Sequence, residues 1–258
     1  YHFDQFLASG GMADVYLGTD VRLRRRVAIK VMLPQMVGDP DLVNRFRREA
    51  QTAALLEHPN IVQIYAIGSM PNGAPYIAMQ FVDGGSLRDT LRRLAGEGKL
   101  LPTVRARGVV RALAEARSFA HAKGVVHRDL KPANVLVRQD GSPVLVDLGI
   151  AAVKSMPKLT QTGTVMGTPE YMSPEQAKGQ AVDGRSDLYS LGIILFELLT
   201  GRVPFTAPDL LAILHQQIYE PPPNLVQLRP DLQPATVQLV RSLLQKAVND
   251  RLQSAAQL

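Results

Sequence analysis

The fold of this 258-residue chain is decided by the stretch HRDLKPAN at residues 127–134, followed thirteen residues later by Asp147-Leu148-Gly149. Together the two motifs supply a carboxylate, a cation and two hard oxygen donors in a short loop that apolar strand-like segments flank. A general base, a phosphate contact and a Mg²⁺ site need these residue types. Chance is a far less probable source of six polar residues at these spacings than function is.

The first 82 residues, on the N-terminal side of this loop, show mostly the composition of strands. Segments rich in Val, Ile, Tyr and Phe are separated by turn signals such as Gly10-Gly11 and Pro71-Asn72-Gly73. The predicted strands are Phe3–Ser9, Val15–Thr19, Val27–Met32, Ile61–Ile67 and Tyr76–Val82. One helix is predicted between them, from Asp39-Pro40, where Asp suits the cap and Pro the first turn, to about Glu57.

After Asp83-Gly84-Gly85 the apolar residues follow a helical period instead of a period of two. The predicted helices are Ser86–Leu94, Thr103–Lys123, Ser186–Thr200, Asp209–Ile218 and Pro234–Ala247. Two short strands, Val135–Val137 and Val144–Val146, and a long irregular stretch from Leu148 to Gln176 lie between these helices. The sequence therefore predicts an α+β fold with a small sheet lobe at residues 1–82 and a larger helical lobe at residues 83–258.

A lysine and a glutamate of the first lobe are predicted to pair. Alternation along Val27–Met32 places Lys30 on a face with apolar neighbours, and a lysine taken alone there could simply extend to water. Glu49, however, falls at helical spacing in the apolar stripe formed by Leu42, Phe46, Ala53 and Leu56. An isolated buried carboxylate is costly, so we expect Glu49 to pair with Lys30 and to aim it at a ligand phosphate.

The segment between the first two strands has a glycine tip at Gly10-Gly11, within residues 7–16. Such a tip lets backbone N–H groups approach phosphates. An ordinary hairpin turn explains the same two glycines equally well, so this segment supports a nucleotide site only together with the other motifs.

Composition excludes several classes of protein. Hydrophobic residues make up 46% and charged residues 20%, as in a globular chain, and the net charge of +6 favours anionic partners. With no cysteine, a disulfide framework, a thiolate metal site and a catalytic thiol are impossible. The longest strongly apolar run, Leu188–Leu199, is too short to span a bilayer. Because the chain opens at Tyr1 without Met or a signal region, we expect it to be an excised domain.

The motifs resemble the catalytic domain of eukaryotic-like serine/threonine protein kinases, most closely the bacterial receptor-type branch, from about Tyr1 to Leu258. They also occur in kinase order. This order runs through the glycine loop, Val27-Ala28-Ile29-Lys30, Glu49, HRDLKPAN, Asp147-Leu148-Gly149, Gly167-Thr168-Pro169-Glu170, Ser173-Pro174-Glu175 and Asp187. The resemblance implies the bilobal protein kinase fold and transfer of the γ-phosphate of ATP to Ser or Thr hydroxyls of proteins.

The resemblance also implies a site with ATP between the lobes. The expected nucleotide contacts are Leu7, Gly10, Gly11, Val15, Ala28, Lys30, Met79, Gln80, Val82 and Leu136. Asn134 and Asp147 are expected to hold Mg²⁺, and Asp129 to orient the substrate hydroxyl and accept its proton. The catalytic set is completed by Lys131, which would steady the transferred group and points to Ser/Thr substrates, and by Lys30 and Glu49.

Further roles implied by the resemblance are structural or regulatory. Glu175 and Arg251 resemble a buried ion pair, Asp187 resembles a residue that braces the catalytic loop, and His127 resembles a packing residue beside Leu148. Thr160 and Thr162 match a pair of threonines that is autophosphorylated in the family. Arg128 would bind their phosphate groups. Two family glycines of the phosphate loop are replaced here, by Ala8 and Ala13, and Leu148 stands where the family has Phe.

Two rival functions remain open, a pseudokinase that acts as a nucleotide-binding scaffold and a small-molecule phosphotransferase. The presence of all expected charged catalytic residues argues against the first, and the extended segment at residues 160–175 argues for a protein substrate. The basic cluster Arg22 to Arg26 lacks interleaved aromatic residues, so no nucleic-acid partner is expected. We also expect no membrane contact by the domain itself and a cytoplasmic location, either in a soluble protein or as the intracellular domain of a membrane-anchored receptor kinase. A homodimer stays open.

Overall fold

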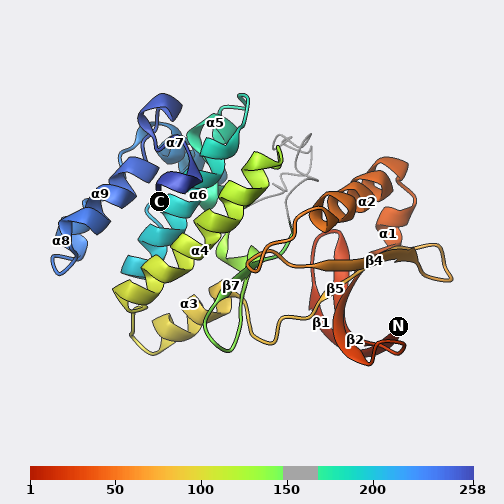
Figure 1. The fold of residues 1–258 in the computed structure, drawn as a ribbon. Helices are drawn as coiled ribbons and strands as arrows, with labels where there is room; N and C mark the ends of the chain where they lie inside the picture. Colours follow the sequence, from red (N-terminus) through yellow and green to blue (C-terminus); the bar gives the residue numbers. More distant parts are fainter. Residues whose placement is uncertain (148–167) are drawn as a thin grey trace.

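The computed structural model describes residues 1–147 and 168–258, and it has two lobes (Figure 1). One lobe is a five-stranded sheet with a helix packed on it, and the other is mostly helical (Figure 1). The α+β fold class predicted from the sequence is therefore confirmed.

The sheet of the first lobe is antiparallel throughout, in the order β1-β2-β3-β5-β4. Its strands are β1 (His2–Ser9), β2 (Ala13–Asp20), β3 (Arg25–Met32), β4 (Ile64–Ser69) and β5 (Pro75–Gln80). In the register of this sheet, Lys30 lies between Val15 on β2 and Ile77 on β5. The central strand β3 thus holds Lys30 with a neighbouring strand on each side.

Helix α2 (Pro40–Ala54) packs on this sheet. It begins as expected, because the side chain of Asp39 accepts hydrogen bonds from the backbone N–H groups of Asp41 and Leu42. Phe46, Ala50 and Ala53 are its buried residues. The helix ends before Glu57, and a short preceding helix, α1 (Pro34–Val37), was not predicted.

The predicted strand at Ile61–Ile67 begins three residues later, at Ile64, because its first residues bond to the other lobe. Ile61 bridges to Leu145, the Val62 N–H donates to the Leu145 carbonyl (2.9 Å), and the Leu145 N–H donates to the Asn60 carbonyl (2.8 Å). The Asn60 side chain also donates to the Pro143 carbonyl (2.7 Å). The segment before β4 therefore ties the two lobes together.

Helices dominate the second lobe. They are α3 (Leu87–Gly96), α4 (Thr103–Ala122), α5 (Pro174–Ala177), α6 (Gly184–Thr200), α7 (Leu210–Tyr219), α8 (Leu225–Leu228) and α9 (Pro234–Leu243). Helix α6 is buried along almost its whole length and packs against α4 and α9. Among the described residues, no helix has both the length and the apolar composition needed to cross a membrane.

Helix α9 ends at Leu243, four residues before its predicted end at Ala247. The chain leaves the helix there and brings two basic side chains back to the core. Lys246 donates to the Tyr189 hydroxyl of α6, and Arg251 pairs with Glu175 of α5. The two short helices α5 and α8 were not predicted, since four residues give too little periodicity.

The HRDLKPAN stretch at residues 127–134, the expected catalytic loop, lies where the two lobes meet. It runs through a 3₁₀ turn (Pro132–Asn134) into β6 (Val135–Val137), which pairs antiparallel with β7 (Pro143–Leu145). Asp147 follows β7 by two residues. This small hairpin therefore brings the 127–134 motif and Asp147 to the same edge of the helical lobe.

Candidate active site

A cleft of about 1390 Å³ lies between the lobes, and it gathers the residues that the sequence singled out. Every described residue of the predicted catalytic, nucleotide and metal sets lines it. These are Leu7, Gly10, Gly11, Val15, Ala28, Lys30, Glu49, Met79, Gln80, Val82, Asp129, Lys131, Asn134, Leu136 and Asp147. Thr160 and Thr162 lie outside the described residues.

The shortest ion pair among the described residues of the cleft joins its two walls. Lys30 Nζ of β3 lies 2.5 Å from Asp147 Oδ1, with 16% of the lysine side chain and 44% of the aspartate side chain exposed. Burial by itself would lower the pKa of Lys30, but the carboxylates of Asp147 and Glu49 outweigh it and raise that pKa. Burial likewise opposes the charge of Asp147, while Lys30 lowers its pKa. Both groups are therefore held in their charged forms.

Glu49 lies in the partly buried stripe of α2, beside the buried residues Phe46 and Ala53, as its spacing predicted. Its charge reaches Lys30, where it contributes to the raised pKa. The direct contact of the Lys30 ammonium is nevertheless with Asp147. A direct Lys30–Glu49 ion pair stays a prediction.

Asp129 stands at the floor of the cleft with two polar partners. Lys131 Nζ lies 2.8 Å from Asp129 Oδ2. The Asn134 side-chain N–H donates to the Asp129 carbonyl (2.9 Å) and to Asp129 Oδ2 (3.2 Å). Because the amide nitrogen of Asn134 faces Asp129, its oxygen is the end that remains for another partner.

The two motif side chains fit the chemistry of Mg²⁺. Asn134 and Asp147 provide hard oxygen donors in one cleft, which is the ligand type that Mg²⁺ prefers. Within residues 1–147 and 168–258, no three His, Cys, Asp or Glu side chains gather into a complete cation site. Protein sites for Mg²⁺ commonly take one or two side chains and complete the shell with water and substrate phosphates, so the donor set is sufficient.

The catalytic loop is held from below by Asp187 of α6. Its Oδ2 accepts from the His127 N–H (3.0 Å) and its Oδ1 from the Arg128 N–H (3.0 Å). Arg128 has a φ of 67°, a left-handed conformation that non-glycine residues seldom adopt. Burial, together with the charge of Arg117, lowers the pKa of His127 to about 4, so its imidazole is neutral and packed rather than poised as a base.

The two alanines of the glycine-rich segment have different surroundings. Ala8 is exposed on β1, and its methyl group meets no core. Ala13 is buried at the start of β2 and packs in the small-lobe core with Met32 and Phe46. The turn between them closes through a hydrogen bond from the Gly10 N–H to the Ala13 carbonyl (2.9 Å). Ala13 is therefore accommodated by packing, which the sequence alone did not show.

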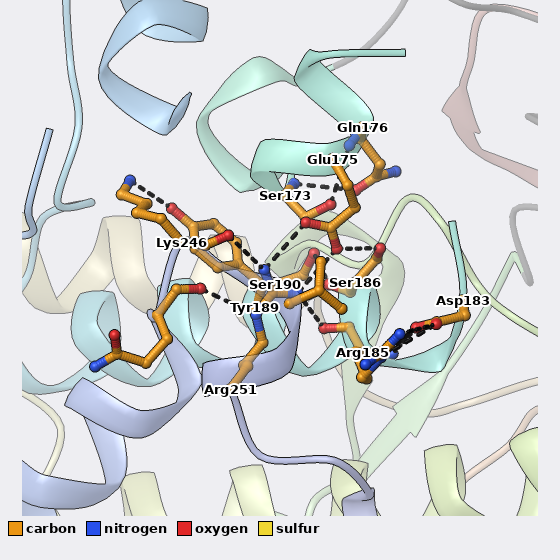
Figure 2. Close-up of polar contacts among 12 residues, drawn as sticks. Ser173, Glu175, Gln176, Asp183, Arg185, Ser186, Tyr189, Ser190, Lys246 and Arg251 are labelled. Carbon is orange, nitrogen blue, oxygen red and sulfur yellow. Dashed lines mark hydrogen bonds and ion pairs between the residues drawn. The ribbon is translucent and has the colours of Figure 1, made fainter. Parts of the chain in front are cut away.

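The predicted ion pair of Glu175 and Arg251 is present and buried (Figure 2). Arg251 Nη1 lies 2.8 Å from Glu175 Oε1 and Nη2 lies 3.0 Å from Oε2, with 0% and 4% of the two side chains exposed. The Ser186 hydroxyl donates to the same Oε1 (2.5 Å), and Arg251 also donates to the Arg185 carbonyl. The pair thereby fixes α5, at the edge of the cleft, to α6 and the C-terminal turn.

A second polar cluster near this ion pair was missed by the sequence reasoning. Buried Gln217 of α7 donates to the carbonyls of Pro169 (3.2 Å) and Glu170 (2.7 Å) and accepts from the Tyr189 hydroxyl (2.7 Å). Lys246 donates to the same hydroxyl (3.0 Å), and burial lowers its pKa to about 7 (Figure 2). A glutamine in an apolar helix and a lysine after α9 give no signal in the sequence that they would meet.

Comparison with known proteins agrees with this fold and site. The family model described as protein kinase domain matches residues 1–258. The chain is 41% identical, over its full length, to serine/threonine-protein kinase PknB of Mycolicibacterium smegmatis and 42% identical to a probable serine/threonine-protein kinase of Streptomyces coelicolor. It spans 41% and 38% of the lengths of these two relatives.

A solved structure gives the same result at the level of the fold. The crystal structure of the PknI kinase domain of Mycobacterium tuberculosis superposes with a TM-score of 0.75 and 30% identity, covering 99% of this chain and 92% of that one. The two-lobed fold with a charged cleft is thus that of a phosphotransferase domain. More particularly, the chain belongs to the protein kinase family, and the resemblance stated from its motifs is confirmed.

Proposed function

We propose that this domain is an active Mg-ATP-dependent serine/threonine protein kinase. The observation that carries the proposal is the convergence of Lys30, Asp129, Lys131, Asn134 and Asp147 in one cleft between the lobes. Phosphoryl transfer depends mainly on positioning and on neutralising charge, and this set supplies both. The names of the relatives support Ser and Thr as acceptors.

The nucleotide is proposed to lie along the cleft, with its base between apolar side chains of both lobes. Ala28 and Met79 belong to one buried apolar cluster, and Val15 and Leu136 pack against it. The backbone of residues 80–82 and the glycine-rich segment at Leu7, Gly10 and Gly11 line the same cleft and would contact the base and the phosphates. Lys30 would then contact phosphate oxygens in place of part of its contact with Asp147.

Asp129 is the proposed base. Its carboxylate would accept a hydrogen bond from the substrate hydroxyl, orient it and take up its proton while that oxygen bonds to the γ-phosphorus and the bond from this phosphorus to the bridging oxygen breaks, with ADP as the leaving group. Lys131, 2.8 Å from that carboxylate, is placed to steady the negative charge of the transferred group. Mg²⁺, held by Asn134 and Asp147, would neutralise charge on the phosphate oxygens.

The test of this function is phosphorylation of a generic protein substrate, such as casein, with Mg-ATP. The wild-type domain is expected to transfer phosphate, and Asp129→Asn is expected to lower kcat by about 10²- to 10⁴-fold, the contribution of a general base. The amide keeps the shape of the side chain, so circular dichroism and melting temperature should stay close to those of wild type. Asp140→Asn, an exposed change in the β6–β7 turn, is the matched control.

The result also separates the rival functions. A pseudokinase would bind nucleotide but give equal, negligible turnover in wild type and Asp129→Asn. A small-molecule phosphotransferase would consume ATP only when an alcohol or amine substrate is added, and it would leave casein unmodified. Either outcome would remove the proposed activity.

Regulation by phosphorylation of Thr160 or Thr162 is a further part of the proposal. Its receiver would be Arg128, whose Nε is buried and has no hydrogen-bond partner among the described residues. A phosphothreonine brings nearly two negative charges and can form one to three charge-assisted hydrogen bonds with a guanidinium. Such contacts would order the segment beside the catalytic loop.

Mass spectrometry of the domain after incubation with Mg-ATP is expected to find phosphate on Thr160 or Thr162. The double variant Thr160→Ala/Thr162→Ala should lose most of its activity towards casein, by about tenfold or more, since one to three charge-assisted hydrogen bonds are absent. Thr206→Ala, a threonine remote from the cleft, is the control. Unmodified threonines in active enzyme, or a fully active double variant, would contradict the switch.

The substrates of the whole protein are proposed to be proteins with Ser or Thr acceptors, and the domain is proposed to work in the cytoplasm. The chain spans about two fifths of the length of the curated relatives. Flanking segments of a longer protein could therefore supply a sensor or an anchor, as in a receptor kinase.

A further inference from the structure

An arginine is buried in the core of the helical lobe, beneath the catalytic loop. The side chain of Arg117, on α4, is 0% exposed. Its helix neighbours Leu113, Ala114 and Ala120 belong to the main hydrophobic cluster. A buried guanidinium is costly unless an anion and hydrogen-bond acceptors compensate it, so a position of this kind needs a reason.

The anion is Asp187, the residue that braces the catalytic loop. Arg117 Nε and Nη2 both donate to Asp187 Oδ2, at 3.1 Å and 2.8 Å, and Nη2 also donates to the Val125 carbonyl (2.9 Å). His121, one turn further along α4, places its Nε2 2.7 Å from the same oxygen. Within the described ranges, Nη1 of Arg117 is buried and has no hydrogen-bond acceptor. The guanidinium is therefore held mainly by Asp187, without all of its donors being satisfied.

The same carboxylate holds the backbone directly before Asp129. Its oxygens accept from the N–H groups of His127 and Arg128, both at 3.0 Å. An ionised carboxylate offers two acceptor oxygens and makes both bonds stronger, and it thereby helps to hold Arg128 at its φ of 67°. A change in the charge or position of Asp187 would therefore move the residue that precedes the proposed base.

We propose that Arg117 is a positioning residue of the catalytic loop, which supplies a constant positive charge that keeps Asp187 ionised and fixed. This inference rests on the proposed kinase activity. An arginine remains protonated throughout the physiological pH range, unlike a histidine. With Arg117 present, the bonds from Asp187 to the catalytic loop do not depend on the protonation state of His121. His121 is a partly exposed side chain in contact with Asp187.

The charged groups around the brace come from three elements. Arg117 and His121 face Asp187 from α4, and His127 and Arg128 face it from the catalytic loop. His121 is 19% exposed and borders a surface cavity of about 360 Å³ that Arg185 of α6 and Asp183, the N-cap residue of that helix, also line. Despite burial, Arg117 holds the pKa of Asp187 well below its ordinary value, in agreement with this arrangement.

The test compares Arg117→Met with wild type between pH 6 and pH 8.5, with casein as substrate. Each kcat is divided by the wild-type kcat at the same pH, so that titration of the proposed base cancels. At pH 8 the variant is expected to be slower by about tenfold or more, within the roughly hundredfold that a misplacement of about 1 Å can cost. At pH 6 the ratio should recover by about threefold or more, because protonation of His121 would supply the missing positive charge beside Asp187.

Further variants separate positioning from a loss of stability. Arg117→Met/His121→Phe should be slow at every pH with a constant ratio, while Arg117→Lys, which keeps the charge, should give a ratio that does not vary with pH. Arg111→Met, an exposed arginine of the same helix paired with Glu115, should match wild type. Because Arg117→Met could fail to fold, Arg117→Gln is measured in parallel, with melting temperatures for all variants.

One readout does not need activity. In a ¹⁵N NMR titration of the imidazole, the midpoint for His121 is expected at higher pH in Arg117→Gln than in wild type, because the histidine then faces Asp187 alone. A wild-type domain without turnover would refute the kinase activity, and this titration would still decide the role of Arg117. An unshifted midpoint, a constant activity ratio in Arg117→Met and Arg117→Gln, or a recovery at pH 6 that persists without His121 would overturn the inference.

Discussion

Replacing Asp147 by asparagine is expected to abolish phosphoryl transfer while leaving the domain folded. The change removes a proposed Mg²⁺ ligand, and a bound metal contributes several kcal/mol of transition-state stabilisation, or about 10³-fold or more in rate. It also removes the partner 2.5 Å from the Lys30 ammonium. The measurement is initial rate of phosphate transfer to casein at saturating ATP, over a range of Mg²⁺ concentrations.

Lys30→Met tests the other half of this contact. The variant should also lose activity by orders of magnitude, but without the altered dependence on Mg²⁺ expected of Asp147→Asn, because methionine removes a phosphate contact and no metal ligand. Asp140→Asn and Lys178→Met, both exposed, are matched controls for the two changes. Near-normal turnover of either cleft variant would contradict the site assignment, and an unfolded circular dichroism spectrum would show that the pair is structural.

Arg251→Met is expected to give the largest loss of stability. It leaves the carboxylate of Glu175, 4% exposed, with the Ser186 hydroxyl as its remaining side-chain donor among the described residues. Removing one partner of a buried ion pair costs about 3–5 kcal/mol. For a domain of this size that lowers the melting temperature by roughly 6–20 °C, measured by circular dichroism.

Two further variants give this result its meaning. Arg93→Met breaks an exposed pair with Glu97 and should change the free energy of unfolding by less than about 1 kcal/mol. Glu175→Leu/Arg251→Met leaves no buried charge and should recover a large part of the lost stability. If Arg251→Met has the same melting temperature as wild type, the Glu175–Arg251 pair in Figure 2 contributes specificity of packing and little stability.

The sequence predicted well which residues of the 127–134 stretch lie together in the cleft, because they are close together in the chain. Asp129, Lys131 and Asn134 lie within six positions, and a 3₁₀ turn after Lys131 is enough to bring their side chains together. The order of strands and helices was also accessible, because long segments with a clear period dominate it. The bounds of α2, β4 and α9 differed from the predicted ones. In these places tertiary contacts begin or end the element, and no local sequence pattern shows such contacts.

Contacts between distant segments were the part that the sequence could not supply. Lys30 contacts Asp147 although 117 positions separate them in the chain. The distance between the two side chains depends on the relative position of the two lobes. Arg117 is a different case, because a signal for it exists: it shares a helical face with Val110, Leu113 and Ala114, at spacings of seven, four and three. A charge inside an apolar stripe identified Glu49, and the same test applied to Thr103–Lys123 would have identified Arg117.

The hydrogen bonds of Asn60 and Val62 to the segment around β7 also limit how the cleft can open. The lobes are joined by the covalent chain after β5 and by this set of bonds, and Lys123 and Arg138 add hydrogen bonds to the carbonyls of Leu55 and Pro59. Sliding of one lobe along the other would break three hydrogen bonds in a buried place. If the domain binds nucleotide as proposed, we therefore expect its exchange to follow a hinge movement of the lobes rather than sliding, with the width of the cleft mouth as the coordinate.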